Sequence, residues 1–164
     1  MDARPMPTAT TTDPFDAEFM ALLRELFEEK IVFNRTLGLE VTQVAAGHAR
    51  GRIAMRPELV GHFAYNRLHG GAISAALDAM GGLAIIAAMA ARHADKTPEQ
   101  RLQYFSRLGT IDLRVDYLRA AIGPSFELQA QVLRLGSRVA STRMECLGAD
   151  GQLLATGAAS YIVA

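Results

Sequence analysis

The chain has 164 residues, the length of a single domain and enough to bury a substantial core. Its 17 basic and 17 acidic residues cancel, so no overall charge attracts nucleic acid or a membrane surface, and any anion-binding site must be local. The single cysteine, Cys146, cannot form an intramolecular disulfide and no signal-peptide pattern follows Met1, so we expect a protein of the reducing cytoplasm.

The first 12 residues are rich in Thr, Pro and Ala and lack apolar periodicity, so we expect a disordered tail ahead of one domain spanning 13–164. An amphipathic helix is predicted next, with Asp13 as N-cap and Pro14 at the first helical position. Apolar residues recur at helical spacing to about Lys30, namely Phe15, Phe19, Leu22, Leu23, Leu26 and Phe27. The polar face is predominantly acidic, which favours a lid or packing element over a membrane anchor.

From Leu37 the residues alternate with period two, which predicts a strand, a turn near Gly47 and a second strand to about Met55. One face of the first strand is expected to carry Leu39, Val41 and Gln43. Together the two strands form a predicted hairpin. Residues 57–67 are expected to be a loop that leads into the next helix.

A long apolar run at 66–91 reads NRLHGGAISAALDAMGGLAIIAAMAA and predicts a helix from about Gly70 to residue 91. It contains one carboxylate, Asp78. Burying an ionised carboxylate is costly unless it is paired or hydrogen-bonded, and an acid isolated among apolar residues is a candidate general base. Because Gly70 and Gly71 lack Cβ atoms, a ligand can approach N–H groups at the helix start, where the helix dipole suits a developing oxyanion.

Gly71 and Asp78 are seven residues apart, so on a helix they differ by about 20° in direction and about 10 Å in rise and share one face. Ser74, Ala75 and Gly82 fall near the same stripe, leaving a shallow furrow for a slender substrate or a neighbouring backbone. The run is long enough to span a bilayer, but its central acid, its glycines and the strands downstream argue against a span. A buried structural helix, whose acid only satisfies neighbouring backbone groups, remains an alternative.

Residues 92–107 are polar, and TPEQ at 97–100 has the form of a capping box with proline at the first helical position, which predicts a short surface helix.

Four strands are predicted after this helix. The first has one apolar face, formed by Ile111, Leu113, Val115 and Tyr117. Turns at 123–124, 136–137 and 150–151 separate the others, which span 126–135, 138–147 and 153–163. Gly136 and Ser137 fit a two-residue hairpin with glycine first.

This order of elements predicts an α+β protein in which one antiparallel sheet of about six strands wraps around the long central helix, with an extra N-terminal helix. The central helix is apolar nearly all round, so covering one of its faces leaves the rest in water. We therefore expect a second subunit to complete its burial.

Two segments resemble a known family. The sequence LHGGAISAALDAMGG at 68–82 places an acid nine residues after His69, and TIDLRVDYLR follows at 110–119. With these motifs in this order, residues 37–163 resemble the hotdog-fold acyl-CoA thioesterases grouped with 4-hydroxybenzoyl-CoA thioesterase and the phenylacetate-pathway thioesterase. The resemblance implies a homodimer, or a tetramer of dimers, in which two sheets join edge to edge and both chains build each active site.

The resemblance also implies roles for single residues. Asp78 is expected to be the general base or nucleophile, and the Gly71 N–H of the other subunit to polarise the thioester carbonyl. Thr110 matches a position where a Ser or Thr helps orient the attacking water. Its strand parity puts it on the face opposite Ile111, so this role needs the dimer or a loop to bring it near. His69 either orients the turn at the helix start or takes part in catalysis.

One position departs from the family pattern. Related proteins usually carry an asparagine six or seven residues before His-Gly-Gly, where this chain has Phe63 and His62. Either His62 or Asn66, three residues before the motif, is expected to take over that polar role, and both remain candidates.

For the nucleotide of coenzyme A, the family resemblance points to strand ends and hairpin loops at the dimer surface. Guanidinium groups and exposed backbone N–H groups suit phosphates there. With His62, the expected substrate-binding residues are Gly70, Arg119, Gly136, Ser137 and Arg138.

We expect hydrolysis of an uncharged acyl-CoA, aliphatic or aromatic, because the furrow is apolar and holds no second charged group. A carboxylate activates water or attacks the carbonyl, while helix-start N–H groups stabilise the oxyanion. No cofactor is expected, since coenzyme A is part of the substrate, and no metal, because the His and Cys residues lack ligand spacing. Two alternatives remain, a hotdog dehydratase or hydratase that uses His69 with Asp78 and a non-catalytic acyl-CoA binding module.

Overall fold

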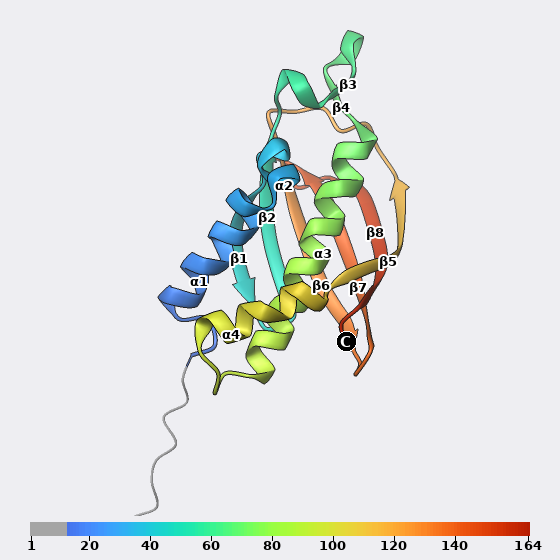
Figure 1. Ribbon diagram of the computed structural model, residues 1–164. Helices are drawn as coiled ribbons and strands as arrows, with labels where there is room; N and C mark the ends of the chain where they lie inside the picture. Colours follow the sequence, from blue (N-terminus) through green and yellow to red (C-terminus); the bar gives the residue numbers. More distant parts are fainter. Residues whose placement is uncertain (1–12) are drawn as a thin grey trace, which may run out of the picture.

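The computed structural model describes residues 13–164, so the tail predicted for 1–12 lies outside the described residues. Within the described range, six strands form one antiparallel sheet in the order β1-β2-β6-β7-β8-β5, which wraps around the long helix α3, Gly70–Arg92 (Figure 1). The strands are β1 Glu40–Ala45, β2 His48–Ala54, β5 Gly109–Tyr117, β6 Ser125–Leu135, β7 Val139–Gly148 and β8 Leu153–Ile162. The predicted architecture of one antiparallel sheet around one central helix is confirmed.

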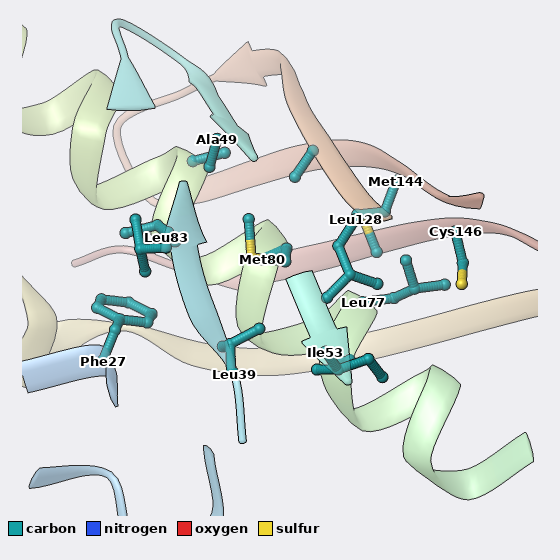
Figure 2. Close-up of a cluster of buried hydrophobic side chains, with 14 of the residues drawn as sticks. Phe27, Leu39, Ala49, Ile53, Leu77, Met80, Leu83, Leu128, Met144 and Cys146 are labelled. Carbon is teal, nitrogen blue, oxygen red and sulfur yellow. The ribbon is translucent and has the colours of Figure 1, made fainter. Parts of the chain in front are cut away.

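Helix α3 is the centre of the core. Its buried side chains pack on β2, β6 and β7, and Met80 and Leu83 lie among the labelled core residues of Figure 2. Each buried Leu, Ile or Met side chain among them stabilises the fold by roughly 1.5–3 kcal/mol. Close packing needs the small residues, because a Cβ on Gly81 would overlap the hydroxyl of Tyr161. The helix has the length and mean hydropathy, 1.8, of a membrane span, but 72% of that window is buried inside the protein, which identifies it as the core helix.

The helix predicted to about Lys30 forms as α1 Ala17–Arg24 and η1 Glu25–Lys30, and a short helix that was not predicted, α2 Val32–Leu37, follows it. These three elements are called here the helical arm. The prediction that Asp13 caps the helix is wrong. Asp16 is the N-cap and accepts from the Phe19 N–H at 2.9 Å, whereas Asp13 accepts from the Phe15 N–H and closes the turn that contains Pro14. After α1 the helix widens to a π-helix, in which the Ile31 N–H donates to a carbonyl five residues back.

The hairpin of β1 and β2 is confirmed, with Gly47 in the left-handed region at φ 72° in its turn. A register shift between Val41 and Gln43 corrects the prediction that Gln43 shares a face with Leu39 and Val41. Beyond this bulge, the half-buried Val44 packs on the core, whereas Gln43 is exposed.

The segment predicted as a loop at 57–67 has short regular elements of its own. The 3₁₀ turn η2, Pro57–Leu59, leads into a small antiparallel pair, β3 Val60–His62 and β4 Arg67–Leu68. A second 3₁₀ turn, η3 Phe63–Tyr65, connects these two strands, and α3 follows β4. In Figure 1 this hairpin stands at the end of the molecule where α3 begins.

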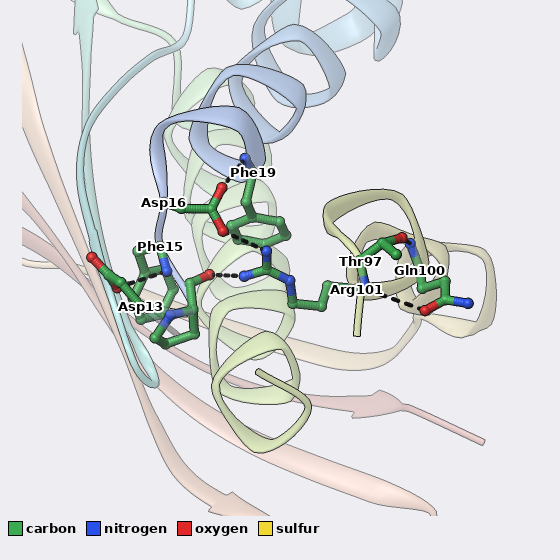
Figure 3. Close-up of polar contacts among 8 residues, drawn as sticks. Asp13, Phe15, Asp16, Phe19, Thr97, Gln100 and Arg101 are labelled. Carbon is green, nitrogen blue, oxygen red and sulfur yellow. Dashed lines mark hydrogen bonds and ion pairs between the residues drawn. The ribbon is translucent and has the colours of Figure 1, made fainter. Parts of the chain in front are cut away.

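The predicted capping box is confirmed, with Thr97 capping α4, Pro98–Leu102. The 3₁₀ segment η4, Gln103–Arg107, connects α4 to β5. This region is more than a surface helix, because the side chain of Arg101 is buried against the helical arm (Figure 3).

The turn between β6 and β7 lies one residue later than predicted. The Gly136 N–H donates to the Val139 carbonyl at 3.0 Å, so Ser137 and Arg138 are the turn residues. Gly136 also lacks the left-handed φ that a glycine-first hairpin requires. The turn at 150–151 is confirmed, with Gly151 at φ 80°.

Strand β5 is an edge strand that pairs only with β8 in the described sheet. Leu113 and Val115 pack on the core as predicted. Ile111 and Tyr117, expected on the same buried face, are 58% and 53% exposed. One chain therefore leaves part of the predicted apolar face uncovered.

Candidate active site

Asp78 lies near the middle of α3, where its side chain is half-buried rather than enclosed. The Thr110 hydroxyl donates to its carboxylate, at 3.0 Å to Oδ1 and 3.3 Å to Oδ2. Among the described residues, this hydroxyl is the hydrogen-bond partner of the carboxylate, which does not bind neighbouring backbone N–H groups. The described contacts therefore lack the backbone bonds that the structural alternative predicted.

The prediction that Thr110 faces away from its own helix is wrong. A register shift between Thr110 and Asp112 leaves Ile111 as an extra residue in β5. Because one extra residue reverses the alternation of side chains, Thr110 faces α3 on the same side as Leu113. The bulge thus builds the contact with Asp78 inside one chain.

Tyr161 is a site residue that the sequence did not indicate. It lies on β8 opposite Thr110, is buried, and its hydroxyl donates to the main-chain carbonyl of Asp78 at 3.0 Å. Burial raises the pKa of Tyr161 well above its ordinary value, and the nearby Asp78 charge adds to the shift. The hydroxyl therefore stays protonated and acts as a fixed donor. The signal in the sequence that could have indicated Tyr161 is a tyrosine that alternates with apolar residues in the last predicted strand.

An apolar pocket of about 300 Å³ opens beside the carboxylate. Helix α3 contributes small residues to one side, as the predicted furrow requires, although Gly71 and Ser74 do not line it. The other walls come from β5, β8, η4 and the helical arm. The lining residues are Phe27, Ile31, Phe33, Asn34, Ala75, Asp78, Ala79, Gly82, Phe105, Leu108, Gly109, Thr110 and Tyr161.

The helix start lies in a different place from this pocket. His69 is the N-cap of α3, and its Nδ1 accepts from the Gly71 N–H at 2.8 Å. The Tyr117 hydroxyl donates to the Gly70 carbonyl at 2.8 Å and fixes the same turn. Two helical turns, about 10 Å, separate Gly71 from Asp78, so one chain does not combine them in one site.

A second pocket, of about 410 Å³, lies at the helix start. It is lined by Arg67, Gly70, Tyr117 and Arg119 together with apolar neighbours, and the Arg119 guanidinium donates to the Leu153 carbonyl at 2.8 Å. The structure therefore joins two predicted binding residues, Gly70 and Arg119. It adds Arg67, whose position two residues before His-Gly-Gly was the signal available in the sequence.

The remaining candidates are dispersed. Gly136 and the turn residues Ser137 and Arg138 lie near the other end of α3, where Arg92 donates to the Leu135 carbonyl, so one chain does not bring them to Arg119.

His62 and Asn66 both belong to the β3–β4 hairpin, and neither lines the Asp78 pocket. The His62 ring stacks on Phe63 and meets Tyr65, and its buried Nδ1 has no hydrogen-bond partner among the described residues. Asn66 is exposed and has φ 47°, which closes the hairpin.

Within residues 13–164, no group of three or more His, Cys, Asp or Glu side chains is arranged to hold a metal ion. Cys146 is buried, and burial raises the pKa of its thiol to about 12. The thiol is therefore protonated at neutral pH and is not a nucleophile.

Comparisons with known proteins identify the family of this chain. The family model described as "Thioesterase superfamily" matches residues 65–155. The medium/long-chain acyl-CoA thioesterase YigI of Salmonella typhimurium is 38% identical over 144 residues, covering 88% of this chain and 93% of the relative, and YigI of Escherichia coli K12 is 37% identical with the same coverage.

Solved structures show the same relationship. A Shewanella oneidensis protein related to the thioesterase superfamily superposes with a TM-score of 0.84 at 37% identity, covering 93% of this chain and 99% of that one. A thioesterase family protein from Silicibacter pomeroyi, at 21% identity and a TM-score of 0.70, shares the fold. The chain therefore belongs to the thioesterase superfamily and has the hotdog fold that its motifs predicted.

Proposed function

We propose that this protein hydrolyses the thioester bond of an acyl-CoA, with Asp78 as the catalytic carboxylate. The observation that carries the proposal is the carboxylate of Asp78, held by Thr110 at the side of an apolar pocket. The names of the YigI relatives, medium/long-chain acyl-CoA thioesterases, support the same reaction. The products are the free acid and coenzyme A.

The proposed chemistry uses Asp78 as a general base toward water. Thr110 holds the carboxylate, which leaves oxygen lone pairs free to take a proton from a water molecule in the pocket. The water oxygen attacks the thioester carbon, the proton passes to Asp78, and the C–S bond breaks as the thiolate of coenzyme A takes that proton. Direct attack by Asp78 is the alternative, and a single turnover in heavy-oxygen water separates the two, because only direct attack places enzyme oxygen in the acid.

The oxyanion donors are proposed to come from a second subunit. The exposed edge of β5 is long and partly apolar, a surface that proteins normally pair or cover. An antiparallel pairing of β5 with its copy sets the Gly109 end of one strand beside the Tyr117 end of the other, and Tyr117 contacts the helix start. The Gly71 N–H of one subunit then approaches Asp78 of the other. To accept from this N–H, the thioester carbonyl oxygen of the substrate must displace or share the hydrogen bond that the N–H donates to His69.

The proposed substrate is an uncharged acyl chain of medium or long length. Within the described part of the chain, Asp78 is the one charged side chain that lines the pocket, and most of the other lining groups are aliphatic or aromatic. A dicarboxylic acyl group would leave its second charge unpaired there. The reaction needs no cofactor besides water, and we propose that it takes place in the cytoplasm.

The deciding experiment compares thiol release from acyl-CoAs by the wild type, Asp78→Asn and Asp112→Asn. Asp112 is an exposed carboxylate on the same strand as Thr110 and serves as the matched control. We expect Asp78→Asn to keep the fold and to lower kcat by about 10²-fold to 10⁴-fold, the range for losing a positioned base, and Asp112→Asn to stay near the wild type. Near-normal turnover in folded Asp78→Asn would rule out the role.

The same assays separate the alternatives. A dehydratase or hydratase would change enoyl absorbance without releasing thiol, and a binding module would bind acyl-CoA without either change. The structure disfavours a His69–Asp78 pair in one chain, because His69 caps the helix two turns away.

A further inference from the structure

Two aromatic side chains from distant segments close one side of the acyl pocket. Phe27 belongs to the π-helical part of the arm and Phe105 to η4, and both line the pocket. Their rings meet edge to face, with centroids 5.9 Å apart and planes at 72°. We call this pair the aromatic wall. Neither residue belongs to the motifs that identify the family, so the wall is supplied by parts of the chain outside them.

Hydrogen bonds tie the part of the arm that carries Phe27 to its surroundings. The buried Asn34 side chain donates to the Phe27 carbonyl at 3.0 Å, satisfying a group near the end of the π-helix. The neighbouring Glu28 carboxylate accepts from the Val41 N–H of β1 at 2.7 Å. Phe27 itself is 2% exposed. These bonds support a packed wall, one of the two roles expected for the N-terminal helix.

A second link fixes the arm relative to the segment that carries Phe105. Arg101 of α4 lies four residues before Phe105, and its side chain is 3% exposed. It pairs with Asp16 at 2.6 Å, donates to the Pro14 carbonyl, and stacks over the Phe19 ring at 4.7 Å (Figure 3). Removing a single partner from such a buried contact leaves an unpaired charge, so the contact holds the two segments at one separation.

We propose that the aromatic wall sets the longest acyl chain that the enzyme accepts, and that Arg101 is a positioning residue for that wall. This inference rests on the proposed function. An acyl chain whose carbonyl lies beside Asp78 runs along the small-residue face of α3, past Ala79 and Gly82, and is bounded by the two rings. The pocket is narrow along that path, because a Cβ on Gly82 would lie 3.1 Å from the Leu108 side chain.

The test measures kcat/KM for saturated acyl-CoAs from hexanoyl to octadecanoyl in Phe105→Ala and Tyr104→Ala. Tyr104 is the matched control, because it is the adjacent half-buried aromatic of η4 but stacks on His93, outside the pocket. We expect Phe105→Ala to raise the ratio of octadecanoyl to decanoyl activity by about tenfold or more, since a few methylenes in an apolar pocket discriminate by that much. Tyr104→Ala should leave the ratio within about twofold.

Two further variants make the test directional. Gly82→Ala fills the path beside Leu108 and should lower the same ratio. Arg101→Lys keeps the charge but loses the fork geometry, and should raise the ratio less than Phe105→Ala does. A merely structural role for Arg101 would lower activity on all chain lengths alike, without changing the profile.

The outcomes distinguish this inference from the proposed function. If the wild type releases thiol but Phe105→Ala and Tyr104→Ala give the same profile, the aromatic wall is not the limit and the inference fails alone. If the wild type releases no thiol from any acyl-CoA, the proposed function fails and the inference fails with it. Thermal melting confirms that each variant is folded before its profile is read.

Discussion

The hydroxyl of Thr110 donates to the carboxylate of Asp78 at 3.0 Å, joining the first residues of β5 to the middle of α3. The bond exists because one extra residue, Ile111, turns the start of β5 toward the helix. A half-buried carboxylate is thereby given one orientation, which a general base needs in order to meet a water molecule repeatedly in the same geometry.

Removing this bond should affect catalysis more than folding. We expect Thr110→Val to lower kcat by about tenfold to 100-fold, because hydrogen bonds to charged groups contribute roughly 1.5–3 kcal/mol. Thr110→Ser keeps the donor and should retain most of the activity. Steady-state thiol release on both variants checks this, and equal activity of the valine and serine variants would contradict it.

A shared site predicts complementation between inactive chains. Gly71→Pro removes the N–H at the helix start, and Asp78→Asn removes the base, so each homodimer should be inactive. A heterodimer of the two restores one complete site, and mixed chains should regain part of the wild-type activity. Sedimentation establishes the oligomeric state, and the same chains mixed with themselves are the control. A folded, active monomer at micromolar concentration would refute the shared site.

Phosphate recognition should depend on a few arginines because the chain has no net charge. Arg119 and Arg138 lie at opposite ends of one sheet, and the proposed antiparallel pairing of β5 with its copy would bring Arg119 of one chain to the Thr110 end of the other. We expect Arg119→Ala or Arg138→Ala to raise KM for acyl-CoA and to leave kcat within a few-fold.

The control substrate for these arginines is a short acyl-pantetheine thioester, which lacks the nucleotide phosphates. Neither variant should affect it. Arg50→Ala, which removes an exposed arginine on β2, should change neither substrate. If acyl-pantetheine hydrolysis falls as much as acyl-CoA hydrolysis, the arginines support the fold or the acyl pocket instead.

The buried thiol predicts a loss of stability at alkaline pH. Burial raises the pKa of Cys146 from 9.0 to about 12, so its contribution to stability is fully present below pH 9 and is lost as the pH rises toward 12. At pH 10 the loss is about 1.4 kcal/mol, the equivalent of one pKa unit. Urea unfolding at pH 8 and pH 10 measures it. The decrease should be smaller in Cys146→Ala, and an equal decrease in both proteins would refute the assignment.

The sequence predicted those features that local patterns determine. The run of small apolar residues identified α3 and its isolated acid Asp78, and the capping box at Thr97 placed α4. Turn residues and strand alternation gave the six-stranded sheet. The family motifs supplied the edge-to-edge assembly as a prediction, which a single chain does not test.

The features that sequence reasoning missed depend on contacts between distant residues. Asp16 rather than Asp13 caps α1, and its carboxylate is held by Arg101, 85 residues away. The Thr110 contact depends on a bulge, because a pattern of period two counts every residue as an alternation. Tyr161 reaches Asp78 only because β8 pairs with β5.

The 85-residue separation of Asp16 and Arg101 also constrains how the protein folds during synthesis. The arm is synthesised before α3 and α4, so its Arg101 contact cannot form until both of them have been made. Closing so long a loop is entropically costly, so we expect the contact to form after the β1–β2 hairpin and after α3. We expect the aromatic side chains of the arm to be exposed until then, and the nascent chain to be most vulnerable to aggregation and proteolysis in that interval.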